Sequence, residues 1–78
     1  MDQNESKPKD MPPHQIIKRS VLLAGHRTSV TLEQAFWNEL EALARREGLS
    51  LNKLITRIDS SRQGNLASAL RLYVLKEK

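Results

Sequence analysis

Residues 27–32 read RTSVTL, and this stretch carries most of the information about the architecture. Three of its six residues are β-branched, and its side chains alternate between a more apolar and a polar face, which is typical of a half-buried strand. The more apolar face consists of Thr28, Val30 and Leu32. The polar face consists of Arg27, Ser29 and Thr31. A strand at about 27–32 that stood alone would leave its backbone edge unpaired, so it needs a strand partner.

Three amphipathic segments follow this strand, and they predict helices at about 33–47, 50–59 and 65–76. Thr31 or Glu33 can cap the first helix, and Gly48 can adopt the left-handed conformation that ends it. Ser50 and Asn65 are suitable N-caps for the second and third helices. The chain is therefore expected to be mainly α-helical, with a short β-ribbon ahead of the helices.

The helical spacing also predicts which side chains form the core. Phe36 is expected to face inward, whereas Trp37 lies about 100° further round the helix, at the edge of the core or at a subunit interface. Leu72 and Leu75 are expected to widen the apolar face of the third helix. The other helical residues expected in the core are Leu40, Leu43, Leu54, Ile55, Ile58 and Leu70.

The size of the chain favours a dimer. A core built from fewer than about 80 residues rarely supplies more than about 3–5 kcal/mol of stability without additional support. The 78 residues include no cysteine, so no disulfide can provide that support, and two histidines are too few for the usual zinc sites. Oligomerisation is the remaining means of stabilisation, and we expect a homodimer in which the core is shared.

Composition excludes several classes of function. The sequence has no glycine-rich phosphate loop and no nucleophile–histidine–carboxylate set at a recognisable spacing, so we expect no catalytic residues, no metal, no cofactor and no enzymatic activity. No apolar run is long enough to span a bilayer, and no hydrophobic stretch of a signal peptide follows the N-terminus. Residues 1–15 contain three prolines and few apolar residues and are expected to form a disordered tail ahead of a domain at 16–78. We expect a cytoplasmic protein without membrane contact.

The strand region is basic and free of acidic residues. The chain has 13 basic and 9 acidic residues, a formal net charge of +4. Residues 16–32 contain Lys18, Arg19 and Arg27 and no acidic residue. Nucleic acid is a natural partner for such a segment, although net charge by itself does not identify a partner.

The order of strand, helix, glycine turn and helix resembles the ribbon-helix-helix family of the MetJ, Arc and CopG type. The elements that carry the resemblance are RTSVTL at 27–32, FWNELEALA at 36–44 and EGLSLN at 47–52. The chain looks most like a bacterial subgroup that shares a KRS…GHRTSV strand region, an FW pair and a C-terminal NLxSALR segment. Here these read Lys18-Arg19-Ser20, Gly25 to Val30, Phe36-Trp37 and Asn65 to Arg71.

The resemblance implies a homodimer whose two chains pair their strands into an intermolecular antiparallel two-stranded sheet that enters the major groove of double-stranded DNA. Arg27, Ser29 and Thr31 would then contact base edges. The residues implied in phosphate contacts are Lys18, Arg19, Ser50, Leu51, Asn52 and Lys53. The implied function is sequence-specific DNA binding by a transcriptional regulator, a repressor or autoregulator that is nucleoid-associated when bound and able to occupy DNA as more than one dimer.

Two points depart from the family pattern or stay open. Residues 59–64 interrupt the second helix, so an extra C-terminal helix is expected. Residues 16–24 form either a second strand of the sheet or an arm that lies along DNA through Lys18 and Arg19. The alternative function is a protein-interaction module, such as the antitoxin half of a toxin–antitoxin pair, which binds a partner protein instead.

Overall fold

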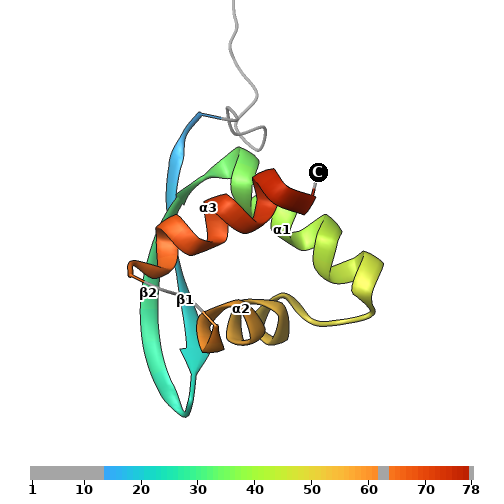
Figure 1. Cartoon of the computed structure of the whole chain (residues 1–78). Coiled ribbons are helices and arrows are strands. Elements are labelled where there is room, and N and C mark those ends of the chain that lie inside the picture. The colour runs from blue at the N-terminus through green and yellow to red at the C-terminus, as the bar shows by residue number, and fades with distance from the viewer. Residues whose placement is uncertain (1–13, 62–63, 78) are drawn as a thin grey trace, which may run out of the picture.

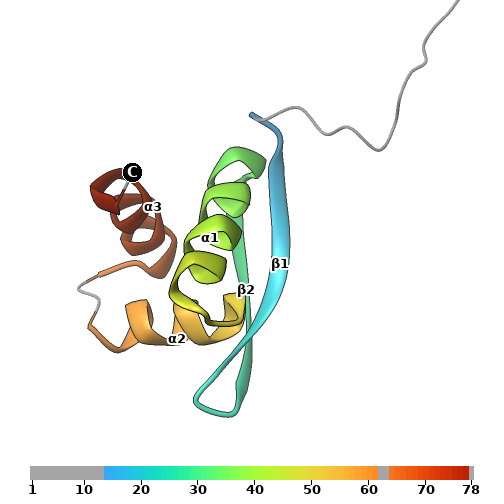
Figure 2. The ribbon, with the colours of Figure 1, turned by 90° about the vertical axis from the view of Figure 1, so that its right-hand side faces the viewer.

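The computed structural model describes residues 14–61 and 64–77. A two-stranded antiparallel sheet is followed by three helices, all on one face of the sheet (Figure 1). The view in Figure 2 shows that the opposite face of the sheet has no helix over it. The elements are β1 (Ile16–Leu23), β2 (His26–Glu33), α1 (Gln34–Glu47), α2 (Leu51–Ser60) and α3 (Leu66–Glu77).

The sheet is a hairpin formed within one chain. β1 pairs with β2 from Ile16 opposite Glu33 to Leu23 opposite His26. The two residues between the strands, Ala24 and Gly25, have φ angles of 51° and 81°. Two positive φ angles are what a two-residue type I′ hairpin turn requires, and its twist matches that of the strands.

This pairing decides between the two interpretations of residues 16–24, because Ile16–Leu23 is a strand rather than an arm. The predicted two-stranded antiparallel sheet and the extra C-terminal helix are confirmed, and both strands of the described sheet belong to one chain. The expected pairing of strands between two chains stays a prediction. A sheet shared between two chains would therefore have to extend this hairpin.

The helices begin and end within one residue of the expected bounds. Gly48, with φ 72°, ends α1 and donates its N–H to Arg45 O and Ala44 O. The hydroxyl of Ser50 accepts the N–H of Lys53 at 3.0 Å and caps α2, and Asn65 accepts the N–H of Ser68 at 3.1 Å ahead of α3. The predicted disordered tail lies outside the described residues, apart from His14 and Gln15.

The core differs from expectation at the aromatic pair of α1. Trp37 is 0% exposed, whereas Phe36 is only half-buried, so the expected roles of the two rings are exchanged. The indole Nε1 of Trp37 donates to the carbonyl oxygen of Ile17 at 2.9 Å, and the guanidinium of Arg19 lies 4.9 Å from the centre of its ring. The Phe36 ring lies near Arg71 of α3, at 5.8 Å. Trp37 therefore joins α1 to β1.

The remaining core side chains come from every element. The side chains with no exposure beside Trp37 are Leu32, Leu40, Leu54, Ile55 and Leu70. Leu72 and Leu75, expected to widen the apolar face of α3, are instead 65% and 62% exposed. No helix within the described ranges is long and apolar enough to cross a membrane.

Replacement of Trp37 by Phe should lower the free energy of unfolding by about 1–3 kcal/mol, because it removes buried volume and the hydrogen bond to Ile17. Chemical denaturation at a fixed protein concentration measures the loss. Phe36→Leu is the matched control and should have a smaller effect, since that ring is half-buried. An equal loss in the two variants would contradict the central position of Trp37.

Candidate nucleic-acid interface

The uncovered face of the hairpin brings together side chains from both strands. We call this set the outer face, and it consists of Lys18, Ser20, Leu22, Arg27, Ser29 and Thr31. All six are exposed, and the register places them in cross-strand pairs: Lys18 opposite Thr31, Ser20 opposite Ser29, and Leu22 opposite Arg27. The three residues expected to contact bases thus lie in one row, beside a second row from β1.

The outer face combines two cations with three hydroxyl groups. Residues 16–32 contain no acidic residue, and the first acid along β2 is Glu33. Its carboxylate accepts from Nε of Arg71 at 3.0 Å. The pKa of Glu33 is lowered from its ordinary value, first by the hydrogen bond to its own backbone N–H and then by the bond to Arg71. This acid is therefore already paired with a cation of α3.

Lys18 and Arg19, which were expected to act together, lie on opposite faces of β1. Lys18 is exposed on the outer face. Arg19 points toward the helices, where its Nη1 lies 2.8 Å from Oε2 of Glu41 and its guanidinium covers the ring of Trp37. Arg19 is thus engaged within the protein, and its geometry does not support the expected phosphate contact.

The first turn of α2 lies beside the tip of the hairpin. Asn52 makes two hydrogen bonds to the backbone of Leu22, accepting its N–H at 2.9 Å and donating to its carbonyl oxygen at 2.8 Å. Ser50 caps the helix, Leu51 is half-buried, and Lys53 is exposed. The α2 N-terminus predicted from the sequence is therefore fixed next to the outer face, although the side chain of Asn52 is occupied.

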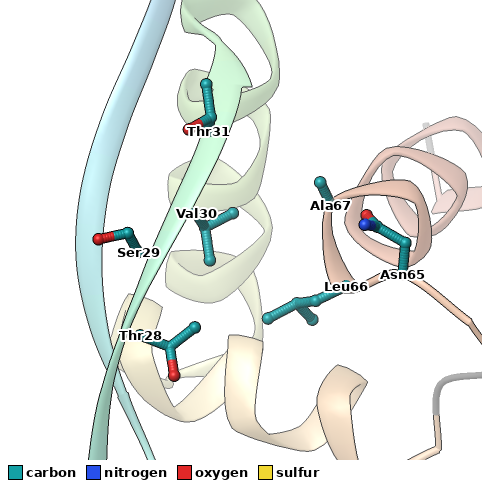
Figure 3. Close-up of a pocket in the computed structure, with 7 residues that line it drawn as sticks. All are labelled: Thr28, Ser29, Val30, Thr31, Asn65, Leu66 and Ala67. Atoms are coloured by element: carbon teal, nitrogen blue, oxygen red, sulfur yellow. The ribbon is translucent and has the colours of Figure 1, made fainter.

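A groove runs along the other side of the hairpin, between β2 and the start of α3. It has a volume of about 260 Å³. Figure 3 shows Val30 and Leu66 directed into the space between β2 and α3, and Ser29 directed away from it. The residues that line the groove are Thr28, Ser29, Val30, Thr31, Asn65, Leu66 and Ala67.

Sequence reasoning missed two members of the outer face, Ser20 and Leu22, and the role of Asn52. The signal for the first two is the alternation of β1, in which Ile17, Val21 and Leu23 face inward. No signal in the sequence marks Asn52, because its partner is 30 residues away. Within residues 14–61 and 64–77, no three His, Asp or Glu side chains gather as metal ligands would.

Comparison with known proteins identifies the fold. Residues 16–77 match the model of the ribbon-helix-helix domain family. A similar solved structure is that of an uncharacterized protein from Bordetella pertussis Tohama I, with 35% identity and a TM-score of 0.73. The similarity covers 83% of this chain and 57% of that protein, so the chain matches little more than half of that protein's length. No curated protein matches the sequence. The family match covers nearly all of the described residues, and the chain belongs to the ribbon-helix-helix domain family.

Proposed function

We propose that the protein binds double-stranded DNA in a sequence-specific manner and regulates transcription by placing the outer face of its hairpin in the major groove. The observation that carries the proposal is that Lys18, Ser20, Arg27, Ser29 and Thr31 share one exposed face that no helix covers. The B-DNA major groove is about 12 Å wide and admits a two-stranded ribbon.

In this proposal the residues of β2 contact the bases. Arg27 can donate two hydrogen bonds to a guanine, and the hydroxyls of Ser29 and Thr31 can serve either type of base. A good bidentate contact discriminates against the wrong base by about 1–3 kcal/mol. Leu22, which lies opposite Arg27 and is 50% exposed, supplies an apolar surface suited to a thymine methyl group.

Phosphate contacts are proposed for the surroundings of the base-contacting row. Lys18 lies on the flanking strand beside Thr31. The backbone N–H groups of Leu51 and Asn52 stand in the first turn of α2, where such groups bind anions, and the exposed Lys53 adds charge. The N–H of Lys53 is already held by Ser50, so Ser50 supports this site as a cap. Arg19 is not part of the proposal.

We further propose that two copies pair through β2. In an antiparallel ladder, alternate residues direct both backbone groups away from their partner strand. The bonds from Leu22 to Asn52 show that Leu22 belongs to that set. Its opposite residue Arg27, and with it Ser29 and Thr31, therefore directs its backbone groups away from β1 at the outer edge of β2. An antiparallel β2 from a second copy would satisfy these groups and be flanked by Leu66 and Ala67 of α3.

The resulting sheet would have four strands in the order β1, β2, β2 and β1. Neighbouring strands lie about 4.8 Å apart, so the two central strands fit the groove while the outer strands reach its walls. This arrangement assigns Arg27, Ser29 and Thr31 to bases and Lys18 to phosphates. A repressor or autoregulator in the cytoplasm is the role we propose, with occupation of repeated half-sites by more than one dimer.

The alternative function, a module that binds a partner protein, would use a different surface. Leu72 of α3 is exposed beside a hollow of about 500 Å³ between α2 and α3. Co-purification distinguishes the two functions, because a protein partner held by apolar contacts survives high salt, whereas DNA is released.

Selection of genomic fragments with purified protein should enrich one repeated or palindromic motif, and Arg27→Ala should relax its sequence preference. We expect a loss of about 1–3 kcal/mol of discrimination at one base pair of each half-site, with the helix content unchanged. Titration of the selected fragment and its point mutants measures this. Unchanged discrimination would refute the assignment of Arg27 to a base.

Ser29→Pro should convert the dimer into a monomer, whereas Ser20→Pro should not. The two serines lie opposite each other, and both direct their N–H groups out of the hairpin, so proline removes no bond of the hairpin ladder in either variant. Only the N–H of Ser29 lies on the edge that we propose to pair. Sedimentation velocity gives the mass, and circular dichroism checks the fold. Equal masses for the two variants would contradict pairing through β2.

Lys18→Ala should weaken DNA binding without lowering stability, whereas Arg19→Ala should lower stability without changing the salt dependence of DNA binding. Loss of Lys18 should reduce the slope of log K against log salt by about 0.9 for each phosphate contact removed, with little change in stability. Loss of Arg19 should lower stability, because it removes the ion pair with Glu41 and the contact with Trp37, while the salt slope stays the same. Salt titrations of DNA binding together with thermal unfolding test both. A reduced slope for Arg19→Ala would return that residue to the DNA contacts.

A further inference from the structure

The two edges of the hairpin are not equivalent, and the difference originates at one residue of α2. The side-chain amide of Asn52 accepts the N–H of Leu22 and donates to its carbonyl oxygen, at 2.9 Å and 2.8 Å. A primary amide presents one acceptor and donors side by side, as a peptide group does. Asn52 therefore occupies the place that a residue of a neighbouring strand would take beside Leu22.

This contact restricts the outer edge of β1. Leu22, Ser20 and Lys18 are the alternate residues that direct their backbone groups away from β2. A strand added at this edge would have to pair with these residues in turn. Because the Asn52 side chain already bonds both backbone groups of Leu22, the added strand could not pair there and would retain only Ser20, Lys18 and the end of the strand at Ile16. Two-stranded pairing over so short a stretch is marginal.

The outer edge of β2 has a different neighbour. Arg27, Ser29 and Thr31 direct their backbone groups away from β1, and Ser29 and Thr31 line the groove that separates β2 from the start of α3. That groove follows four consecutive residues of the strand, from Thr28 to Thr31. The edge of β2 is thus bordered by a groove along these residues, whereas the edge of β1 is interrupted at Leu22 by the Asn52 side chain.

We propose that Asn52 blocks the edge of β1 and thereby limits the association between copies of this chain to the edge of β2. Exposed strand edges lead to uncontrolled association unless they are covered. The proposal rests on the dimer proposed above, and it adds the reason why the assembly stops at two copies. Asn52 is a positioning residue here, since it acts through β1 and not on a base.

Symmetry determines what its removal does. Pairing of β2 with β2 uses the same edge of both copies and closes after two. If β1 could pair with β1 as well, each copy would have two such edges, and alternating pairs would continue into an open-ended ribbon. Loss of the block should therefore produce species larger than a dimer, rather than a different dimer.

The test is Asn52→Ala in the full chain, compared with the unsubstituted protein by sedimentation velocity without DNA over a hundredfold range of concentration. We expect the unsubstituted protein to remain a dimer, and the variant to form species of four copies and more whose fraction rises with concentration. Asn52→Asp should behave similarly, because it retains an acceptor for Leu22 N–H but directs a carboxylate oxygen at the Leu22 carbonyl. Thr56→Ala is the matched control, since its hydroxyl bonds only to the Asn52 backbone carbonyl one turn earlier, and it should remain a dimer.

The outcomes separate this proposal from the proposed function. A variant that keeps its helix content and remains a dimer overturns the edge block and leaves pairing through β2 intact. A monomeric unsubstituted protein with a dimeric Asn52→Ala variant supports the block and overturns pairing through β2. Monomers in both cases overturn both.

Amide hydrogen exchange of the unsubstituted protein decides the matter if Asn52→Ala does not fold. The N–H of Leu22 should exchange at least about tenfold more slowly than that of Ser20, its neighbour on the same edge, because only Leu22 has the Asn52 partner. Equal exchange at the two positions would overturn the proposal.

Discussion

The pairing of β1 with β2 is the constraint on which the rest of the structure depends. Side chains alternate along a strand, so a shift of one residue in the register would exchange the two faces of the hairpin. In the observed register Val21, Val30 and Leu32 are buried against the helices, and Lys18 and Arg27 are exposed on the opposite face. The same pairing determines which backbone groups each edge presents to a second molecule.

Trp37 and Asn52 connect the helices to this register. Trp37 contacts β1 through the carbonyl of Ile17, and Asn52 contacts it through both backbone groups of Leu22, five residues further along the strand. A shifted register would disrupt both contacts and would bring Arg19 away from Glu41. Each hydrogen bond contributes only about 0.5–1.5 kcal/mol, yet together the contacts favour one arrangement over its alternatives.

Local patterns predicted most of the fold, and contacts between distant residues account for what they missed. Gly48, Ser50 and the alternation of 27–32 act within a few residues, so their consequences are visible in the sequence. The sequence leaves the role of residues 16–24 open, because Lys18-Arg19-Ser20 interrupts the apolar run. Arg19 falls at an inward position of β1, where Trp37 and Glu41 accommodate it. Trp37 and Phe36 both fit a helical stripe, and the choice between them depends on how α3 packs, with Arg71 beside Phe36. The alternation of 27–32 also predicts the β2 part of the candidate site. Ser20 and Leu22 can be assigned to that site only from the pairing of the two strands.

The distribution of charge also shows why position, rather than net charge, supports DNA binding. Four arginines, Arg19, Arg46, Arg57 and Arg71, form ion pairs with glutamates of the same chain. Such pairs contribute little to the field that a DNA phosphate experiences, because each is accompanied by its counter-charge. Lys18 and Arg27 lie on the outer face, and Lys53 lies at the N-terminus of the helix that Asn52 holds beside it. In the proposed dimer each of these cations would occur twice about one axis, so a modest net charge would be presented to DNA as a compact symmetric set.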